Sequence, residues 1–113
     1  QIFLQQDFFF LLKEGITPRW EDPPNNRGGY WSFRIRKDDA NEIWKKLSAS
    51  LVGNTITEDE KLLHTITGIS ISSKIANCVI KIWNNDKNIN YTTKFTNKIE
   101  YLHEDKIRYN IPS

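Results

Sequence analysis

The sequence contains one cysteine and no methionine in 113 residues. A single thiol, Cys78, excludes an intrachain disulfide framework and a zinc site built from several thiolates. His64 and His103 lie far apart and have no ligand-like spacing around them, so we expect ordinary surface or hydrogen-bonded histidines. This cysteine usage fits a reducing, cytoplasmic location. We expect no metal and no cofactor.

Long apolar runs and a strong charge of one sign are also missing. No run reaches the ~20 apolar residues that span a bilayer, and residues 2–12 lack the basic leader of a signal peptide. No membrane contact is therefore expected. The formal net charge of +2 is too small for a protein that coats nucleic acid by charge alone. If RNA binds, it should bind at a discrete pocket with a few placed cations.

The length of 113 residues allows one small domain. Ile, Asn and Lys are abundant, which is typical of AT-rich genomes and favours a protist, parasite or large-virus source. Since methionine is absent, we expect residues 1–113 to be part of a longer chain. Residues 1–113 are accordingly predicted to form a single, partial domain.

Alternation of apolar and polar residues predicts the strands. Residues 8–13 form an apolar run, and residues 30–36 place Trp31, Phe33 and Ile35 on one side. Residues 67–74 and 78–84 should pair as a hairpin that bends at residues 76–77. Residues 98–103 are expected to form an edge strand. The proline-rich residues 16–29 should form a long loop, since neither helix nor strand tolerates that composition.

Two capping boxes predict helices between these strands. The first lies at residues 39–42 and opens a helix that continues through Leu47 and ends with Gly53 at the C′ position. The second lies at residues 57–60 and opens a short helix through Leu62 and Leu63. The pattern predicts an α+β fold in which helices cover one face of a curved antiparallel sheet.

The predicted hairpin separates two kinds of side chain by parity. Isoleucines fill the face that should meet the helices, whereas Lys74, Lys81 and Trp83 share the opposite face. Two cations beside an exposed indole suit a phosphorylated ligand that carries a ring. The alternative is that these side chains simply cover the surface of a sheet.

Trp20 and Glu21 lie inside the predicted loop, where no periodicity directs Trp20 into a core. Trp20 is therefore either a plug of the loop or a platform for a ligand. The Glu21 carboxylate can accept two parallel hydrogen bonds from N1–H and the amino group of guanine. Methylation at N7 makes guanine cationic, which adds a cation–π contribution to stacking on indole.

Residues 15–22 read GITPRWED and residues 26–31 read NRGGYW. This ungapped block resembles the signature of the eukaryotic translation initiation factor 4E family, which binds the 7-methylguanosine cap of messenger RNA. Two later blocks, residues 44–53 and 68–83, are similar to that family in the same order. The resemblance covers about residues 7–84.

The resemblance implies a role for each site residue. Trp20 is similar to one of the two cap-stacking tryptophans, Glu21 to the carboxylate that reads guanine, and Trp83 to the tryptophan beside the N7-methyl group. Lys74 stands where the family has a phosphate-binding Arg. Lys81 can replace a second phosphate-binding Lys of the family.

Other positions qualify the resemblance. Val79 occupies the place of that second Lys, while Trp31 and Trp44 match buried family positions. The resemblance also implies that the first strands, the first helix and the other stacking tryptophan would precede residue 1. The fold it implies is a curved antiparallel sheet with helices packed on the convex face.

The resemblance implies capped mRNA as ligand and a scaffold protein of the initiation factor 4G type on the helical face. Lys45, Lys46 and Ala49 stand where the family docks that scaffold with apolar side chains. The expected function is cap binding in translation initiation. The alternative is a degenerate relative that acts through protein contacts without strong cap binding. An enzyme is not expected, because no nucleophile–base pair or metal-binding carboxylate cluster is present.

Overall fold

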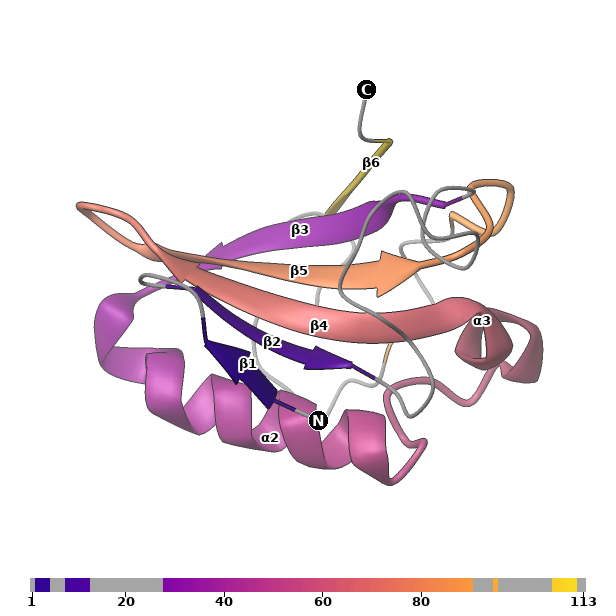
Figure 1. Ribbon diagram of the computed structural model, residues 1–113, viewed down its shortest axis with the longest axis horizontal. Coiled ribbons are helices and arrows are strands. Elements are labelled where there is room, and N and C mark those ends of the chain that lie inside the picture. The colour runs from indigo at the N-terminus through magenta and orange to yellow at the C-terminus, as the bar shows by residue number, and fades with distance from the viewer. Residues whose placement is uncertain (1, 5–7, 13–27, 91–94, 96–106, 112–113) are drawn as a thin grey trace.

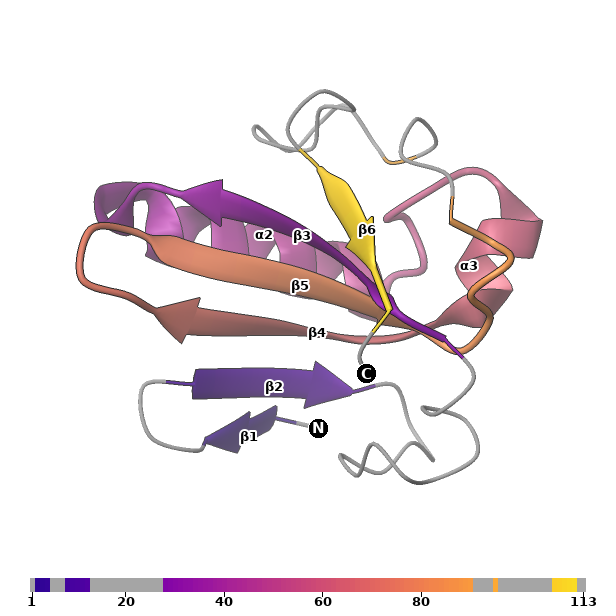
Figure 2. The ribbon, with the colours of Figure 1, turned by 90° about the horizontal axis from the view of Figure 1, so that it is seen from above.

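The computed structural model describes residues 2–4, 8–12, 28–90, 95 and 107–111. Six antiparallel strands form one sheet in the order β1-β2-β4-β5-β3-β6 (Figures 1 and 2). The strands are β1 (Ile2–Leu4), β2 (Phe8–Leu12), β3 (Tyr30–Ile35), β4 (Ile66–Ser73), β5 (Cys78–Asn84) and β6 (Arg108–Asn110). Neither β1 nor β6 was predicted, whereas the other four strands were.

The β4–β5 hairpin forms the centre of the sheet. Ile69 pairs with Ile82 and Ile71 pairs with Ile80, so four isoleucines point toward the helices from adjacent strands. The connection closes with a hydrogen bond from the Lys74 N–H to the Asn77 carbonyl at 2.8 Å. The predicted bend is therefore confirmed. The predicted strand was one residue too long, because Lys74 belongs to the connection and not to β4.

A single long helix covers one face of the sheet. The helical segments are the 3-10 helix η1 (Lys37–Asp39), α2 (Ala40–Val52) and α3 (Glu60–Thr65). Figure 2 looks onto the sheet with α2 behind it. Ile43, Leu47 and Leu51, at helical spacing, are buried on the inner side of α2. The α+β class is confirmed, with helices on one side of an antiparallel sheet.

Both predicted capping boxes were wrong in detail. The Asp39 side chain makes no hydrogen bond to the first turn of α2, and its carboxylate instead accepts from Arg36 Nε at 3.0 Å. In α3 the N-cap is Asp59, whose carboxylate accepts from the Leu62 N–H at 3.0 Å. Thr57 stands outside the helix, and its hydroxyl accepts from the Asp59 N–H at 3.1 Å. The first box thus fails because Asp39 bonds to Arg36, and the second fails because Asp59, not Thr57, is the N-cap.

The end of α2 lies one residue later than predicted. Gly53 has φ −83°, whereas Asn54 has φ 57° and adopts the left-handed conformation. The Asn54 N–H donates to Leu51 O at 3.3 Å, and the Thr55 N–H donates to Ser50 O at 2.8 Å. These two bonds form a Schellman motif in which Asn54 takes the C′ position.

The core lies between α2 and the sheet. Its centre is Trp31, which is fully buried and contacts the rings of Phe95 and Tyr109 at centroid distances of 5.1 and 4.9 Å. The buried position predicted for Trp31 is confirmed. Trp44 was predicted to be buried as well, but it is only half-buried and packs at the edge of the core.

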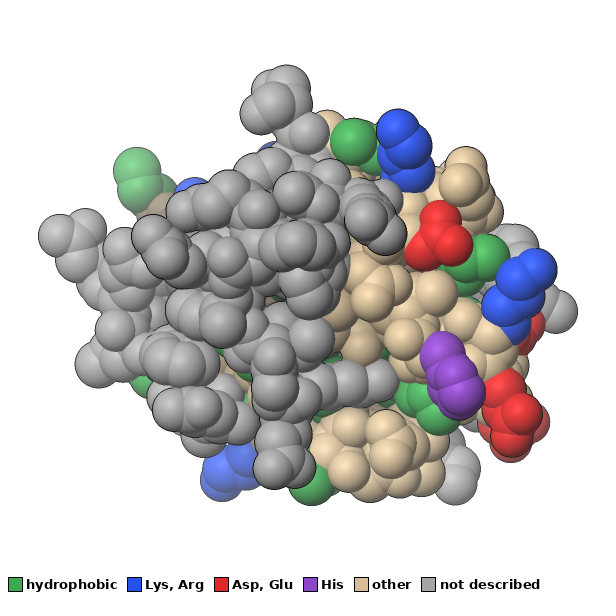
Figure 3. Space-filling view, turned by 45° about the vertical axis from the view of Figure 1, so that its right-hand side comes forward, with side chains coloured by type: hydrophobic (Ala, Val, Ile, Leu, Met, Phe, Trp, Pro, Cys, Tyr) green, Lys and Arg blue, Asp and Glu red, His purple; other side chains and the backbone are tan. Residues whose placement is uncertain are grey.

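On the described surface near α3, acidic, basic and histidine side chains are interspersed, and no patch of one charge sign is seen there (Figure 3). None of the helices that the structure describes is long and apolar enough to cross a membrane. The predicted loop at residues 16–27 and the predicted strand at residues 98–103 lie outside the described residues.

Candidate functional site

The face of the sheet opposite α2, called here the open face, is organised in rows of side chains. Residues paired directly across antiparallel strands share a face, so the register defines each row. The aromatic row contains Trp83 and Tyr30, followed by Asn110. The lysine row contains Ser70, Lys81, Ser32 and Arg108. The next row contains Ser72, Val79 and Arg34.

The first two rows meet in what we call the Tyr30–Lys81–Trp83 cluster. The rings of Tyr30 and Trp83 lie 4.7 Å apart between centroids and are tilted by 47°. Lys81 Nζ lies 4.5 Å from the Tyr30 centroid and 5.6 Å from the Trp83 centroid. The aromatic faces therefore fix the ammonium group at the junction of β3 and β5.

The electrostatics of the cluster favour an anion. Burial, followed by the nearby positive charge of Lys74, lowers the pKa of Lys81. Among the residues that the structure describes, no carboxylate pairs with Lys81. A phosphate placed beside this amine would supply the missing negative charge and raise the pKa again.

Trp83 is held by a second contact from beneath. Its indole N–H donates to the Ser70 hydroxyl at 3.0 Å, and Ser70 is buried on the central strand β4. The ring is thus fixed between this hydrogen bond and the Tyr30 ring. Neither Tyr30 nor Ser70 was among the predicted site residues. The alternation of β3 was the available signal for Tyr30, because it places Tyr30 on the side opposite Trp31.

The structure brings together two of the five predicted site residues. Lys81 and Trp83 meet in the cluster. Lys74 is exposed in the β4–β5 connection, at the end of the hairpin opposite Trp83, and acts on Lys81 only through its charge. Trp20 and Glu21 lie outside the described residues.

Asn84, the residue after Trp83, joins three parts of the chain. Its Oδ1 accepts from the Gly29 N–H at 3.0 Å and from the Tyr109 hydroxyl at 2.6 Å. Its Nδ2 donates to the carbonyls of Asp86 and Ile89, both at 2.8 Å. Asn84 is 1% exposed, so these four bonds replace all contact with water. Nothing in the sequence pattern singled out this residue.

The two glycines of the RGG motif are required by close approach to this asparagine and its neighbours. A Cβ on Gly28 would collide with the Asn84 carbonyl oxygen, and a Cβ on Gly29 would collide with the Asn110 carbonyl oxygen. Any larger residue would displace backbone at both places. The glycines therefore bring the chain that follows Trp20 and Glu21 directly against the end of β5.

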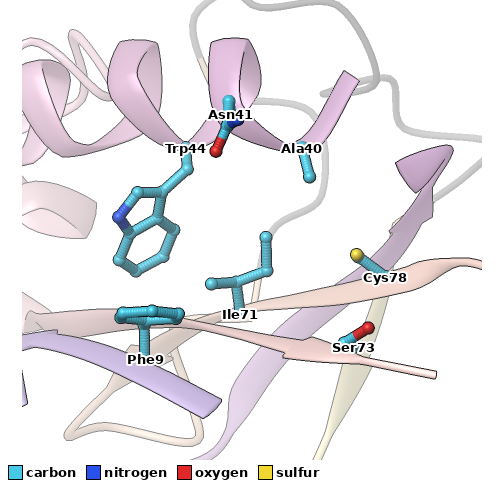
Figure 4. A pocket seen from close by; sticks show the side chains of 7 residues that line it. All are labelled: Phe9, Ala40, Asn41, Trp44, Ile71, Ser73 and Cys78. Carbon is cyan, nitrogen blue, oxygen red and sulfur yellow. The ribbon is translucent and has the colours of Figure 1, made fainter. Parts of the chain in front are cut away.

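A pocket with a cavity volume of about 390 Å³ lies between α2 and the sheet (Figure 4). The Trp44 indole and the Phe9 ring point toward each other across it, and Phe9 is 42% exposed (Figure 4). Its other lining residues are Ala40, Asn41, Ile71, Ser73 and Cys78. Lys45 and Lys46 lie on the exposed side of α2, where Lys46 pairs with Glu42 at 3.3 Å.

The described fold is thus an α+β domain. The α2 helix covers one face of its sheet, and the open face carries the Lys81 ammonium beside the rings of Tyr30 and Trp83. Residues 3–112 match the family model of eukaryotic initiation factor 4E. The chain belongs to the eukaryotic initiation factor 4E family.

Relatives with curated descriptions include the eukaryotic translation initiation factor NCBP of Triticum aestivum. It is 34% identical over 74 residues, which are 66% of this chain and 30% of the relative. The eukaryotic translation initiation factor 4E of Candida albicans is 32% identical over 91 residues, 76% of this chain and 42% of the relative. The chain therefore spans less than half the length of these relatives.

Solved structures show the same arrangement. The complex of Ascaris suum eIF4E-3 with m7G cap superposes with a TM-score of 0.59 at 27% identity, over 71% of this chain and 45% of that chain. The complex of C. elegans eIF4E-3 with the 4E-binding protein Mextli and cap analog has a TM-score of 0.62 at 27% identity, over 72% and 45%.

Proposed function

We propose that this chain binds the 7-methylguanosine cap of mRNA in translation initiation. The observation that carries the proposal is the Tyr30–Lys81–Trp83 cluster, where a half-buried ammonium group without an acidic partner among the described residues lies beside an indole. An anionic ligand with a cationic ring satisfies both groups at once. The family membership and the relatives solved with m7G cap support the same ligand.

Each proposed site residue contacts a different part of the cap. Trp83 contacts the N7-methyl side of the guanine, where the positive charge of the methylated ring meets the indole face. Trp20 stacks on the base, and Glu21 accepts the N1–H and amino hydrogens that distinguish guanine. Lys81 binds the phosphate nearest to the base, and Lys74 contacts the end of the triphosphate from the hairpin connection.

The lysines differ in what they contribute. Lys81 is already held by two rings, so little side-chain entropy is lost when phosphate binds. Lys74 is exposed and must be ordered by the ligand. The neighbouring Val79, on the same face, offers no charge. The chain acts by binding, and we assign it no catalytic step.

A scaffold protein occupies the helical face in this proposal. Relatives with this fold were solved with 4E-binding proteins, among them Mextli. On this chain the exposed residues of α2 include Lys45 and Lys46, so a partner segment should carry acidic side chains beside its apolar ones. We further infer action in the cytoplasm and a protist or viral source.

Retention on an immobilised 7-methylguanosine matrix tests the proposal against the alternative of a degenerate relative. The full-length protein should be retained and should elute with free m7GTP but not with GTP. A protein that acts only through protein contacts would pass through the matrix and would still capture a scaffold. A Trp83→Ala variant that still unfolds in a cooperative thermal melt should lose retention.

A further inference from the structure

Two arginines extend the positive charge of the open face beyond the residues that the proposed function uses. Arg108 on β6 lies directly opposite Ser32, and Ser32 lies directly opposite Lys81. Arg34 lies two residues along β3 from Ser32 and therefore faces the same way. Both arginines are exposed, and neither forms an ion pair with another described residue.

The spacing follows from the sheet itself. Neighbouring strands lie about 4.8 Å apart, so the backbone positions of Lys81 and Arg108 are separated by roughly 10 Å. Arg34 stands about 7 Å along the strand from the line that joins them. The three cations therefore form a triangle over β5, β3 and β6, with one corner at the cluster assigned to the cap.

The charged side chains that the described strands place on this face are all positive. No strand that the structure describes contains an acidic residue. The described carboxylates all lie in helices and connections, namely Asp38, Asp39, Glu42, Glu58, Asp59, Glu60 and Asp86. Among the described residues, the strands thus place Lys81, Arg34 and Arg108 on the open face and no carboxylate beside them.

We propose that Arg34 and Arg108 bind the phosphodiester backbone of the RNA that follows the cap. The inference rests on the proposed function, because the cap fixes where the strand begins. RNA is favoured over an acidic peptide, since the aromatic row of Tyr30 and Trp83 runs beside the lysine row and bases stack on such rings. The open face would then bind a capped strand and not only the cap nucleotide.

Titrations of the full-length protein with three ligands distinguish affinity for the cap from affinity for the RNA that follows it. The ligands are m7GTP, a capped RNA of six nucleotides, and the same RNA without a cap. The test variant is Arg34→Gln/Arg108→Gln. The control is Lys37→Gln/Lys61→Gln, which removes the same charge from exposed positions in η1 and α3. Thermal melts should show that both variants fold as the wild type does.

The test variant should lose about five- to tenfold affinity for the capped RNA and less than twofold for m7GTP. The slope of log K against log salt for the capped RNA should become shallower by about 1.4, from two phosphates at roughly 0.7 each. The control should leave all three affinities unchanged. Equal losses on m7GTP and capped RNA, or no loss on RNA, would overturn the inference.

The two proposals fail separately. If wild-type protein does not bind m7GTP, the proposed function is wrong, but a loss of uncapped RNA binding in the test variant would still support the arginine contact. If m7GTP binds normally and the test variant binds capped RNA as the wild type does, only the arginine contact is wrong. An acidic peptide that competes as well as RNA of equal charge would also overturn the RNA assignment.

Discussion

The indole N–H of Trp83 donates to the hydroxyl of Ser70 at 3.0 Å across the β4–β5 ladder. Ser70 is 1% exposed and lies on the central strand, so it cannot move to follow the ring. The Tyr30 ring, at a centroid distance of 4.7 Å, supports the indole from β3. The orientation of the proposed cap-contacting ring is therefore fixed before any ligand binds.

A Ser70→Ala variant should show what this hydrogen bond contributes. The indole N–H would lose its partner, and we expect the free energy of unfolding to fall by about 0.5–1.5 kcal/mol in urea denaturation. Discrimination between m7GTP and GTP should fall as well, because the ring gains freedom. Ser72→Ala, on the same face of the same strand, is the control. Equal effects of both changes would mean that Ser70 only fills space.

An Asn84→Ala variant should be far less stable than wild type. Gly29 N–H, the Tyr109 hydroxyl and the two carbonyls of residues 86 and 89 would all lose a buried partner. We expect a loss of about 2–4 kcal/mol in the free energy of unfolding. Asn88→Ala, an exposed position in the same connection, should cost under about 0.5 kcal/mol. Similar losses would rule out the buried network as the cause.

The stability of the protein at alkaline pH should report the raised pKa of Tyr109. Burial, outweighing the hydrogen bond to Asn84, raises the pKa of Tyr109 from 10.0 to about 12. Between these values the unfolded chain releases the phenolic proton while the folded protein retains it. The free energy of unfolding should therefore fall as pH rises from about 10 toward 12.

Tyr109→Phe removes this titration, so the difference in stability between wild type and variant should narrow across that range. Denaturation in urea at several pH values measures it. A constant difference from pH 8 to 12 would contradict the raised pKa.

The fold was predictable where the pattern is local. The alternation of residues 30–36 and 78–84 indicated both strands, because every second residue faces the core. The first capping box failed because the Asp39 carboxylate bonds to Arg36, a partner that a spacing rule does not include. The second failed because Asp59, two residues after Thr57, caps the helix. Strand β6 was not predicted because its three residues form a strand only by pairing with β3. That strand lies more than 75 positions earlier in the chain.

The sequence predicted part of the candidate site, namely the residues that strand alternation places on one face. Parity placed Lys81 and Trp83 on one face, and the register confirms that placement. Parity also assigned Lys74 to that face, although the strand ends before it. Asn84 was not identifiable, since its partners come from residues 29, 86, 89 and 109, and only the folded chain brings them together.

Replacement of Lys81 should weaken phosphate binding more than replacement of Lys74. Lys81→Ala should weaken m7GTP binding by about 1–2 kcal/mol, because a held, half-buried cation is lost. Lys74→Ala should cost at most about 1 kcal/mol, since an exposed pair is screened. Binding of 7-methylguanosine, which lacks phosphate, should change little in either variant. If both variants lose equal affinity for the nucleoside, the lysines support the fold and not the ligand.

Guanine reading by Glu21 is tested by a Glu21→Gln variant. The change replaces two charge-assisted hydrogen bonds by neutral ones and adds a mismatched donor. Isothermal titration of the full-length protein should show a loss of about 1–3 kcal/mol on m7GTP. Unchanged affinity would mean that Glu21 does not read the base.

The open face is proposed to bind a methylated, cationic guanine, and the preference for that base over unmethylated guanine can be measured. Titration of the full-length protein with m7GTP and with GTP, followed by tryptophan fluorescence, tests it most directly. We expect saturable quenching by m7GTP, at least tenfold weaker binding of GTP, and loss of most of that preference in Trp83→Ala. Equal affinity for the two nucleotides, or no binding of either, would contradict it.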